Sequence, residues 1–268
     1  MMKSKPLLAI VSGGSRGIGE AIVKQLSESG IHCATLSRSK NVDILHPNQT
    51  HFQCDVSNAA QVSETIKTIT QHYHKTHAMN ILINAAGVSH DGLLVRFPQD
   101  ELEKIIAINL QGTMNVCKSS LRYFMLSHSS AESPSCIINI SSIIGGSPNM
   151  TNVGQSIYAA SKAGVIAFSQ HLARELLGKH IRVNCVSPGF IETEMTRNLQ
   201  QQQQQLLQKQ EQNTCVSNLE AMSVRQKLEK VQIGKPHHVA NLVQFLISPQ
   251  AEYINGQNII VDGGLSIL

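Results

Sequence analysis

The sequence has few aromatic residues, few charged residues and no long apolar run. It contains four Tyr and six Phe in 268 residues, and no basic stretch is interleaved with aromatics, which argues against a nucleic-acid-binding protein. Lys and Arg number 22 against 18 Asp and Glu, without the dense basic blocks of nucleic-acid arms. Every strong apolar run is soon broken by Gly, Ser or Asn, so none approaches the ~20 residues that cross a bilayer. We therefore expect no nucleic-acid partner and no membrane insertion.

The sequence also lacks paired cysteines. Its cysteines are far apart, with no C-x-x-C pair, and most lie in apolar runs, which predicts buried free thiols in a reducing compartment. The histidines from His72 to His77 could be read as a metal site, but no Cys or carboxylate accompanies them at ligand spacing. We expect a solvated helix end there and no metal. The six cysteines are Cys33, Cys54, Cys117, Cys136, Cys185 and Cys215.

Short apolar runs alternate with helical patterns along the chain. A hydrophobic content of 41% is sufficient for a large core, and alternation of buried strands with amphipathic helices requires crossover connections. The pattern predicts one doubly wound, Rossmann-type α/β domain over residues 1–268, with a mostly parallel sheet of about seven strands and helices on both faces. The clearest expected strands are 7–12, 32–36, 81–83, 137–140, 181–186 and 259–261, and the expected helices are 58–75, 99–127, 156–178 and 236–247.

Two regions depart from this alternation. Between Arg38 and Phe52 the chain is too short, and contains Pro47, so that a loop is expected in place of one crossover helix. Gln200 to Gln205 is an uninterrupted glutamine run within Gln-rich, amphipathic sequence. We expect an enlarged helical flap at about 197–233, inserted before the helix that follows Pro236.

A glycine-rich segment follows the first expected strand. Three separated glycines there allow backbone amides to approach a pyrophosphate, and the next helix adds the partial positive charge of its N-terminus. The same spacing also occurs in plain tight turns, but its position between a buried strand and a helix favours a dinucleotide. The predicted contacts are Gly13, Ser15, Arg16, Gly17, Ile18 and Gly19.

The end of the second strand indicates which dinucleotide is bound. A carboxylate is usual there in NAD sites, whereas a 2′-phosphate requires cations. Arg38 stands at this position and Arg16 projects from the glycine loop, so we expect NADPH or NADP+; a solvated surface role for Arg38 is the alternative. Asp55 and Val56, after the third strand, are expected at the adenine, although a simple helix cap beginning at Ser57 explains the same residues.

Tyr158 and Lys162 are four residues apart, on one face of the helix starting near Ser156. Ser142 ends the preceding strand, and strand carboxyl ends share an edge with the amino ends of the following helices, so we expect these side chains together beside the cofactor. Reducing a carbonyl requires a proton at oxygen. An adjacent ammonium would lower the pKa of the phenol from about 10, and Ser142 would orient the substrate oxygen. An inert surface Tyr/Lys pair is the alternative.

With these motifs, nearly the whole chain resembles the short-chain dehydrogenase/reductase family. Asn84-Ala85-Ala86-Gly87 is similar to the family's N-A-A-G turn, which implies that Asn84, Ala85 and Gly87 contact the cofactor. Asn109 matches the family's active-site asparagine, which anchors a water relay to the lysine. Simpler roles stay open: Asn84 in satisfying a turn, and Asn109 in bending its helix. The resemblance further implies a nicotinamide-binding segment comprising Pro188, Gly189, Ile191 and Thr193.

Within the family, the segments 84–96, 154–158, 188–193 and 261–264 resemble those of 3-oxoacyl-[acyl-carrier-protein] reductases. This implies NADPH-dependent reduction of a 3-oxoacyl thioester to the (R)-3-hydroxyacyl thioester in fatty-acid synthesis. The chain departs from bacterial members in a longer loop between Ser142 and Tyr158, in the missing crossover helix and in the Gln-rich flap. A carbonyl or quinone reductase of the same fold is the nearest alternative, and a non-catalytic cofactor-binding subunit of a mixed oligomer is another.

The resemblance also implies an acyl carrier protein as partner and a homotetramer. Lys179 and Arg122 are candidates for contacts to the acidic carrier, or else belong to solvated helix faces. Only six residues precede the first strand, so no secretory signal is expected. Long glutamine tracts suggest a eukaryotic source, and eukaryotic enzymes of this type mostly serve the mitochondrial pathway. We therefore expect a mitochondrial location, with the cytoplasm second.

Overall fold

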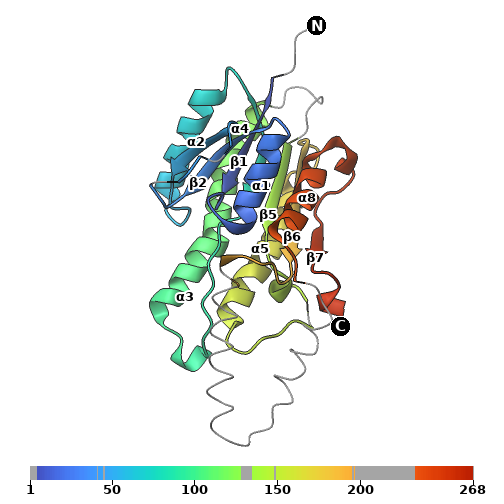
Figure 1. Ribbon diagram of the computed structural model, residues 1–268. Helices are drawn as coiled ribbons and strands as arrows, with labels where there is room; N and C mark the ends of the chain where they lie inside the picture. Colours follow the sequence, from blue (N-terminus) through green and yellow to red (C-terminus); the bar gives the residue numbers. More distant parts are fainter. Residues whose placement is uncertain are drawn as a thin grey trace, which may run out of the picture.

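The computed structural model (Figure 1) describes residues 5–40, 42–44, 46–127, 135–147, 149–194, 196 and 233–267. The Gln-rich flap expected at about 197–233 lies outside these residues, except for Ile233. Cys215 also lies outside them. The other five cysteines are buried and unpaired, as their apolar surroundings predicted.

Seven parallel strands form one sheet in the order β3-β2-β1-β4-β5-β6-β7. The strand order reverses between β1 and β4, and ligands in such sheets bind beside this switch point at the carboxyl ends of the strands. The doubly wound class is confirmed. The strands are β1 (Leu7–Ser12), β2 (His32–Ser37), β3 (Gln49–Gln53), β4 (Ala78–Asn84), β5 (Ser135–Ile140), β6 (Ile181–Pro188) and β7 (Asn258–Val261).

Helices cover both faces of the sheet (Figure 1). Side chains alternate along each strand, so Leu8 and Ile10 pack with α2, α4 and α5, whereas Ala9 and Val11 pack with α1 and α8. The longer helices are α1 (Gly17–Glu28), α2 (Ala59–Tyr73), α3 (Gln99–Ile106), α4 (Gly112–Ser127), α5 (Ser156–Glu175) and α8 (Pro236–Ile247). Short helical turns are η1 (Leu94–Arg96), η3 (Ile143–Gly145), η4 (Pro249–Ala251) and η5 (Leu265–Ile267).

The prediction of a single helix over 99–127 is wrong in one respect. A π-helical turn, η2 (Ala107–Gln111), separates α3 from α4. Asn109 lies within it, and its side chain bonds the backbone of Val88 outside the helix. Such turns interrupt a helix where local contacts outweigh regular hydrogen bonding, so the regular helix is interrupted at Asn109.

The other expected elements differ only at their ends. The described residues between β2 and β3 contain no helix, as the short spacing and Pro47 predicted. Helices α2 and α5 end two or three residues earlier than expected, at Tyr73 and Glu175. No helix among the described residues is long and apolar enough to cross a membrane.

Candidate active site

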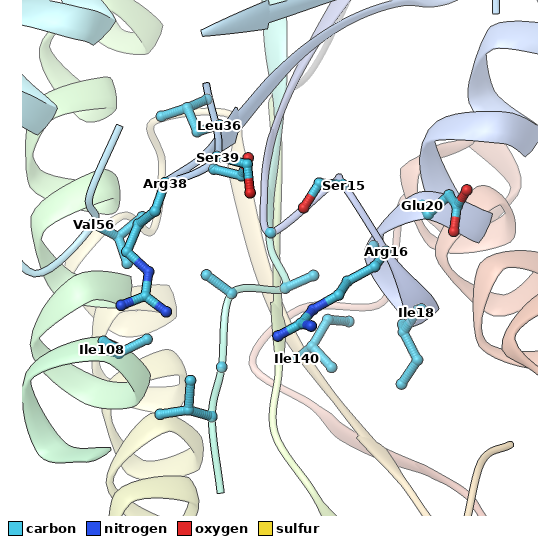
Figure 2. A pocket seen from close by; sticks show the side chains of 18 of the residues that line it. Ser15, Arg16, Ile18, Glu20, Leu36, Arg38, Ser39, Val56, Ile108 and Ile140 are labelled. Carbon is cyan, nitrogen blue, oxygen red and sulfur yellow. The ribbon is translucent and has the colours of Figure 1, made fainter. Parts of the chain in front are cut away.

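A cavity of about 550 Å³ opens at the carboxyl edge of the sheet (Figure 2). Its walls come from the loops after β1, β2, β3 and β4, from the end of β5, and from α5 and residues 193–194. The volume lies within the usual range for a bound small molecule. Fourteen of the predicted site residues line it: Gly13, Ser15, Arg16, Gly17, Ile18, Gly19, Arg38, Asp55, Val56, Ala85, Gly87, Tyr158, Lys162 and Thr193.

The glycine loop is pressed against the turn that follows β4. Gly13 has φ +72°, its N–H donates to the Leu36 carbonyl at 2.8 Å, and a Cβ there would lie 2.6 Å from the Ala86 backbone. A Cβ on Gly19 would lie 2.1 Å from the Gly13 carbonyl oxygen. Side chains are therefore excluded at both positions. Because the N-cap residue of α1, Arg16, makes no side-chain capping hydrogen bond, the first amides of the helix are available to a phosphate.

Two guanidinium groups reach into the cavity from different loops, as Figure 2 shows for Arg16 and Arg38. Arg16 Nη1 donates to Glu194 Oε2 at 2.9 Å, with both side chains about two-thirds exposed. The Arg38 backbone is held by β3, because Gln53 Nε2 donates to its carbonyl at 3.1 Å. Arg16 and Arg38 together are called the arginine pair. Cations on two walls suit an anionic ligand.

Asp55 both lines the cavity and holds a turn. Its Oδ1 accepts from the Ser57 backbone N–H at 2.9 Å and from the Ser57 hydroxyl at 2.7 Å. The N-cap of α2 is Asn58, whose side chain accepts from Gln61 N–H. The capping role is thus carried by Asn58, while Asp55 and Val56 form the wall where the adenine contact was expected.

The expected catalytic side chains gather where β5 meets α5. Lys162 is 5% exposed, its Nζ donates to the Ile140 carbonyl at 2.9 Å, and it lies 5.8 Å from the centroid of the Tyr158 ring. Ser142 follows β5, caps η3 by accepting from Ile144 N–H, and interacts with the Tyr158 phenol through its side chain. Tyr158 and Lys162 line the cavity, whereas Ser142 is not among its lining residues. We call the region formed by Ser142, Tyr158 and Lys162 the β5 end of the cavity.

Electrostatics at the β5 end differ from the expectation in one respect. Burial raises the pKa of Tyr158; a hydrogen bond with Ser142 opposes this rise, and the Asp91 carboxylate adds to it. Burial lowers the pKa of Lys162 to about 8. The expected lowering of the phenol pKa by the ammonium is therefore not found in the protein alone, because removal from water disfavours the charged form of both groups.

Asn109 is fully buried and does not line the cavity. Its Oδ1 accepts from Val88 N–H at 2.8 Å, and its Nδ2 donates to the Val88 carbonyl at 2.9 Å and to Ser161 Oγ at 3.0 Å. A Cβ on Gly87 would lie 3.4 Å from both Asn109 Oδ1 and Lys162 Nζ. Asn109 thus fixes the loop after β4 against the catalytic helix. Ser161, which completes this link, was not predicted, although it immediately precedes Lys162.

The side chain of Asn84 does not line the cavity, contrary to the predicted cofactor contact. It is 2% exposed and belongs to a buried polar row across β1, β4, β5 and α5. Its Oδ1 accepts from Ser12, its Nδ2 donates to Asn139 Oδ1 at 2.8 Å, and Asn139 donates to Ser169 at 2.9 Å. These bonds tie together the strand ends that carry the site, in keeping with the simpler structural role for Asn84.

Only part of the segment after β6 lines the cavity. Pro188, Gly189 and Ile191 lie outside the lining, whereas Thr193 is within it. Gly189 N–H bonds the Val261 carbonyl at 2.9 Å, and Ile191 is buried beside Gly234. The lining residues that were not predicted are Glu20, Leu36, Ser37, Ser39, Val42, Asp43, Cys54, Ala86, Val88, Ile108, Ile140, Ser141 and Glu194.

No group of three or more potential metal ligands lies together in the described part of the chain. His72 and His77 instead belong to a ring cluster with His32 and Tyr73, at the end of α2. Burial is the largest cause that lowers the pKa of both His32 and His77. His72 and His74 are exposed, in keeping with the expected solvated helix end, whereas Tyr73 is buried and His77 is half-buried.

Sequence comparison gives the family. A family model of short-chain dehydrogenase/reductases, described as Enoyl-(Acyl carrier protein) reductase, matches residues 13–266. The chain belongs to the short-chain dehydrogenase/reductase family. It is thus an oxidoreductase of a family that uses nicotinamide cofactors.

Named relatives of this dehydrogenase/reductase match over almost their full length. Carbonyl reductase family member 4 of Xenopus tropicalis is 35% identical, over 96% of this chain and 97% of the relative. The 3-oxoacyl-[acyl-carrier-protein] reductase of Vibrio cholerae is 34% identical, over 97% and 98%, and that of Mus musculus 35%, over 96% and 97%. The ligand-free structure of Thermoplasma acidophilum aldohexose dehydrogenase superposes with a TM-score of 0.79 at 30% identity, covering 98% of this chain and 95% of that one.

Proposed function

We propose that this enzyme uses NADPH to reduce 3-oxoacyl-[acyl-carrier-protein] to (R)-3-hydroxyacyl-[acyl-carrier-protein] in fatty-acid synthesis. The observation that carries the reaction type is the grouping of Ser142, Tyr158 and Lys162 where β5 meets α5. The substrate is supported by the similarity to enzymes named for it, at 34% and 35% identity over nearly the whole chain.

The cavity fits the proposed cofactor. Its glycine loop leaves no room for side chains where backbone amides would meet a pyrophosphate. Arg38 would hold the 2′-phosphate that distinguishes NADP from NAD, while Arg16, already paired with Glu194, would add little. Asp55 and Val56 would contact the adenine, and Thr193 the nicotinamide. Bound NADPH supplies the hydride that the carbonyl carbon receives.

The residues of the chain supply the proton. Tyr158 is protonated at neutral pH, because a phenol has an ordinary pKa of about 10 and burial raises it further, so the phenol can donate to the carbonyl oxygen as negative charge develops there. Ser142 would hold the same oxygen by a hydrogen bond. The pKa of Lys162, about 8, allows its ammonium to return a proton near neutral pH. Asn109 ties the Val88 segment to Ser161, which immediately precedes Lys162.

Substrate assays test this proposal. NADPH oxidation is followed with acetoacetyl-[acyl-carrier-protein] and, in parallel, with simple quinones. We expect kcat/KM for the carrier-protein thioester to exceed that for quinones by at least about tenfold, the factor given by about 1.4 kcal/mol of extra transition-state binding. Rapid quinone reduction with negligible thioester turnover would instead favour a carbonyl reductase, the function in the name of the Xenopus relative. Failure to turn over either would favour the non-catalytic subunit.

We further propose a homotetramer that receives acyl carrier protein in the mitochondrion. Exposed apolar side chains at Met125 and Leu126 of α4 and at Tyr253 and Ile267 near the C-terminus are suitable for contacts between subunits. Arg122 and Lys179 are exposed and would meet the acidic carrier. Sedimentation should give a tetramer, and a stable monomer would contradict it. Imaging a C-terminal fluorescent fusion distinguishes mitochondrion from cytoplasm.

A further inference from the structure

Two side chains of β3 hold the backbone of the loop that carries Arg38. Gln53 Nε2 donates to the Arg38 carbonyl at 3.1 Å, and His51 Nε2 donates to the next carbonyl, that of Ser39, at 2.9 Å. A carbonyl oxygen only accepts, so the Nε2 atom of His51 carries a proton. His51 and Gln53 are two residues apart and therefore lie on the same face of β3. We call these two hydrogen bonds the β3 clamp.

The loop that the β3 clamp holds replaces a crossover helix. The described residues between β2 and β3 contain no helix, so helical hydrogen bonds do not fix the described part of this loop. β3 itself is held from two sides. It pairs with β2 over Gln49–Gln53, and Asn48, directly before it, exchanges hydrogen bonds of 3.1 and 3.3 Å with Ser27 of α1. The β3 clamp thus ties the loop to a fixed part of the fold.

The loop carries charges of both signs. Arg38 and Asp43 both line the cavity, and Lys40 lies between them in the sequence without lining it. A guanidinium attracts a phosphate, whereas a carboxylate repels it. Which charge faces a ligand therefore depends on how the loop backbone is held. With both hydrogen bonds of the β3 clamp made, the Arg38 side chain reaches into the cavity, as Figure 2 shows.

We propose that His51 and Gln53 are positioning residues that set the preference for NADPH over NADH. By binding the Arg38 and Ser39 carbonyls from β3, they hold the Arg38 guanidinium where the 2′-phosphate binds. Neither side chain lines the cavity, so both act through the loop and not by contact with the cofactor. NADH lacks the 2′-phosphate, and its binding should not depend on the β3 clamp. The inference rests on the proposed use of NADPH, with Arg38 as the ligand of its 2′-phosphate.

Binding of the two cofactors to the full chain tests the inference. The Kd values for NADPH and NADH are measured by fluorescence titration for the wild type and for the double variant His51→Leu/Gln53→Met, which removes both donors. We expect the Kd for NADPH to rise about tenfold in the double variant and about threefold in Gln53→Met alone, as the net contribution of one or two hydrogen bonds implies. The Kd for NADH should stay within about twofold. Gln71→Met, the same change at an exposed glutamine of α2, should alter neither value.

Two comparisons distinguish positioning from a merely structural role. His51→Gln retains an N–H donor and should restore most of the NADPH affinity that His51→Leu loses. In an Arg38→Gln background, the double variant should raise the Kd for NADPH by no more than about threefold, because the group that the β3 clamp positions has been removed and the two effects are then not additive.

Three results would each overturn the inference: an unchanged Kd for NADPH in the folded double variant, an equal rise for NADH, or a tenfold rise that persists after Arg38→Gln. If the double variant does not fold, Gln53→Met decides alone, since Gln53 is exposed. The titration requires no carbonyl substrate, so failure to reduce 3-oxoacyl thioesters would contradict the proposed reaction alone. A wild type without preference for NADPH would contradict both the proposed cofactor and the β3 clamp, whereas a preference that the variants retain would contradict only the clamp.

Discussion

At the β5 end of the cavity Lys162 is 5% exposed and bonded to a strand carbonyl, whereas Arg16, in the arginine pair, is about two-thirds exposed. Burial changes the pKa of Tyr158 and Lys162. Exposed ion pairs are screened by water and contribute little. Under the proposed function, desolvated groups perform the proton chemistry and solvated groups select the cofactor. Changes at the β5 end should therefore have larger effects than changes in the arginine pair.

The largest effect is expected for Tyr158→Phe. This variant keeps the ring and removes only the proton donor, which typically contributes about 10²- to 10⁴-fold. We expect kcat to fall within that range while the Kd for NADPH, measured by fluorescence titration, stays within about threefold, or ~0.7 kcal/mol. A kcat close to that of the wild type would show that another group supplies the proton.

The next effect concerns stability and its pH dependence. The Lys162 pKa falls from 10.5 in its ordinary state to about 8 on folding, so between these values the unfolded chain binds more protons and wild-type stability rises with pH. Below pH 8 the buried charge costs about 3 kcal/mol, and the hydrogen bond to Ile140 returns about 1 kcal/mol. Lys162→Met should therefore be about 2 kcal/mol more stable at pH 7, and this advantage should disappear towards pH 10.

Denaturant unfolding of both proteins at pH 7 and pH 10 checks this prediction, because most other titrations cancel when the two are compared at one pH. A stability difference that does not vary with pH would show that Lys162 is not desolvated as the structure indicates. It would also weaken the contrast between the β5 end and the arginine pair.

Arg38→Gln is expected to have a smaller effect, which concerns cofactor binding. Losing one partly solvated contact to a phosphate costs about 1–2 kcal/mol, so the KM for NADPH should rise about tenfold while the KM for NADH changes little. Lys40→Gln is the matched control, because it removes a nearby cation that does not line the cavity. An equal loss with both cofactors would contradict the assignment of Arg38 to the 2′-phosphate.

The smallest effect is expected for Arg16→Gln. Its guanidinium is already paired with Glu194 in an exposed contact, and such pairs contribute about 0–1 kcal/mol. The KM for NADPH should change by less than about threefold. A rise comparable to that of Arg38→Gln would mean that Arg16 leaves Glu194 to hold the cofactor, as its position in the glycine loop first suggested.

Local backbone requirements were the features most readily predicted from the sequence. Each of three such features is recognisable from a few neighbouring residues: the glycine loop, the pair Tyr158 and Lys162, and the short connection after Arg38. The structure brings them to one edge of the sheet. The partners of buried amides depend on distant segments: Asn84 on β4 bonds Asn139 on the neighbouring strand β5, and Asn109 bonds Val88. The apolar walls at Ile108 and Ile140 have no chemistry that distinguishes them from core residues. Strand-end positions such as Ser37 and Ser141 could have been found from the rule that ligands bind at strand carboxyl ends.

A structure with NADP+ bound tests the central claim most directly. It should show the pyrophosphate against the glycine loop, the 2′-phosphate beside Arg38, and the Tyr158 hydroxyl facing the hydride-bearing carbon of the nicotinamide ring across the β5 end. A nucleotide bound elsewhere, or a phenol turned away from that carbon, would contradict the account.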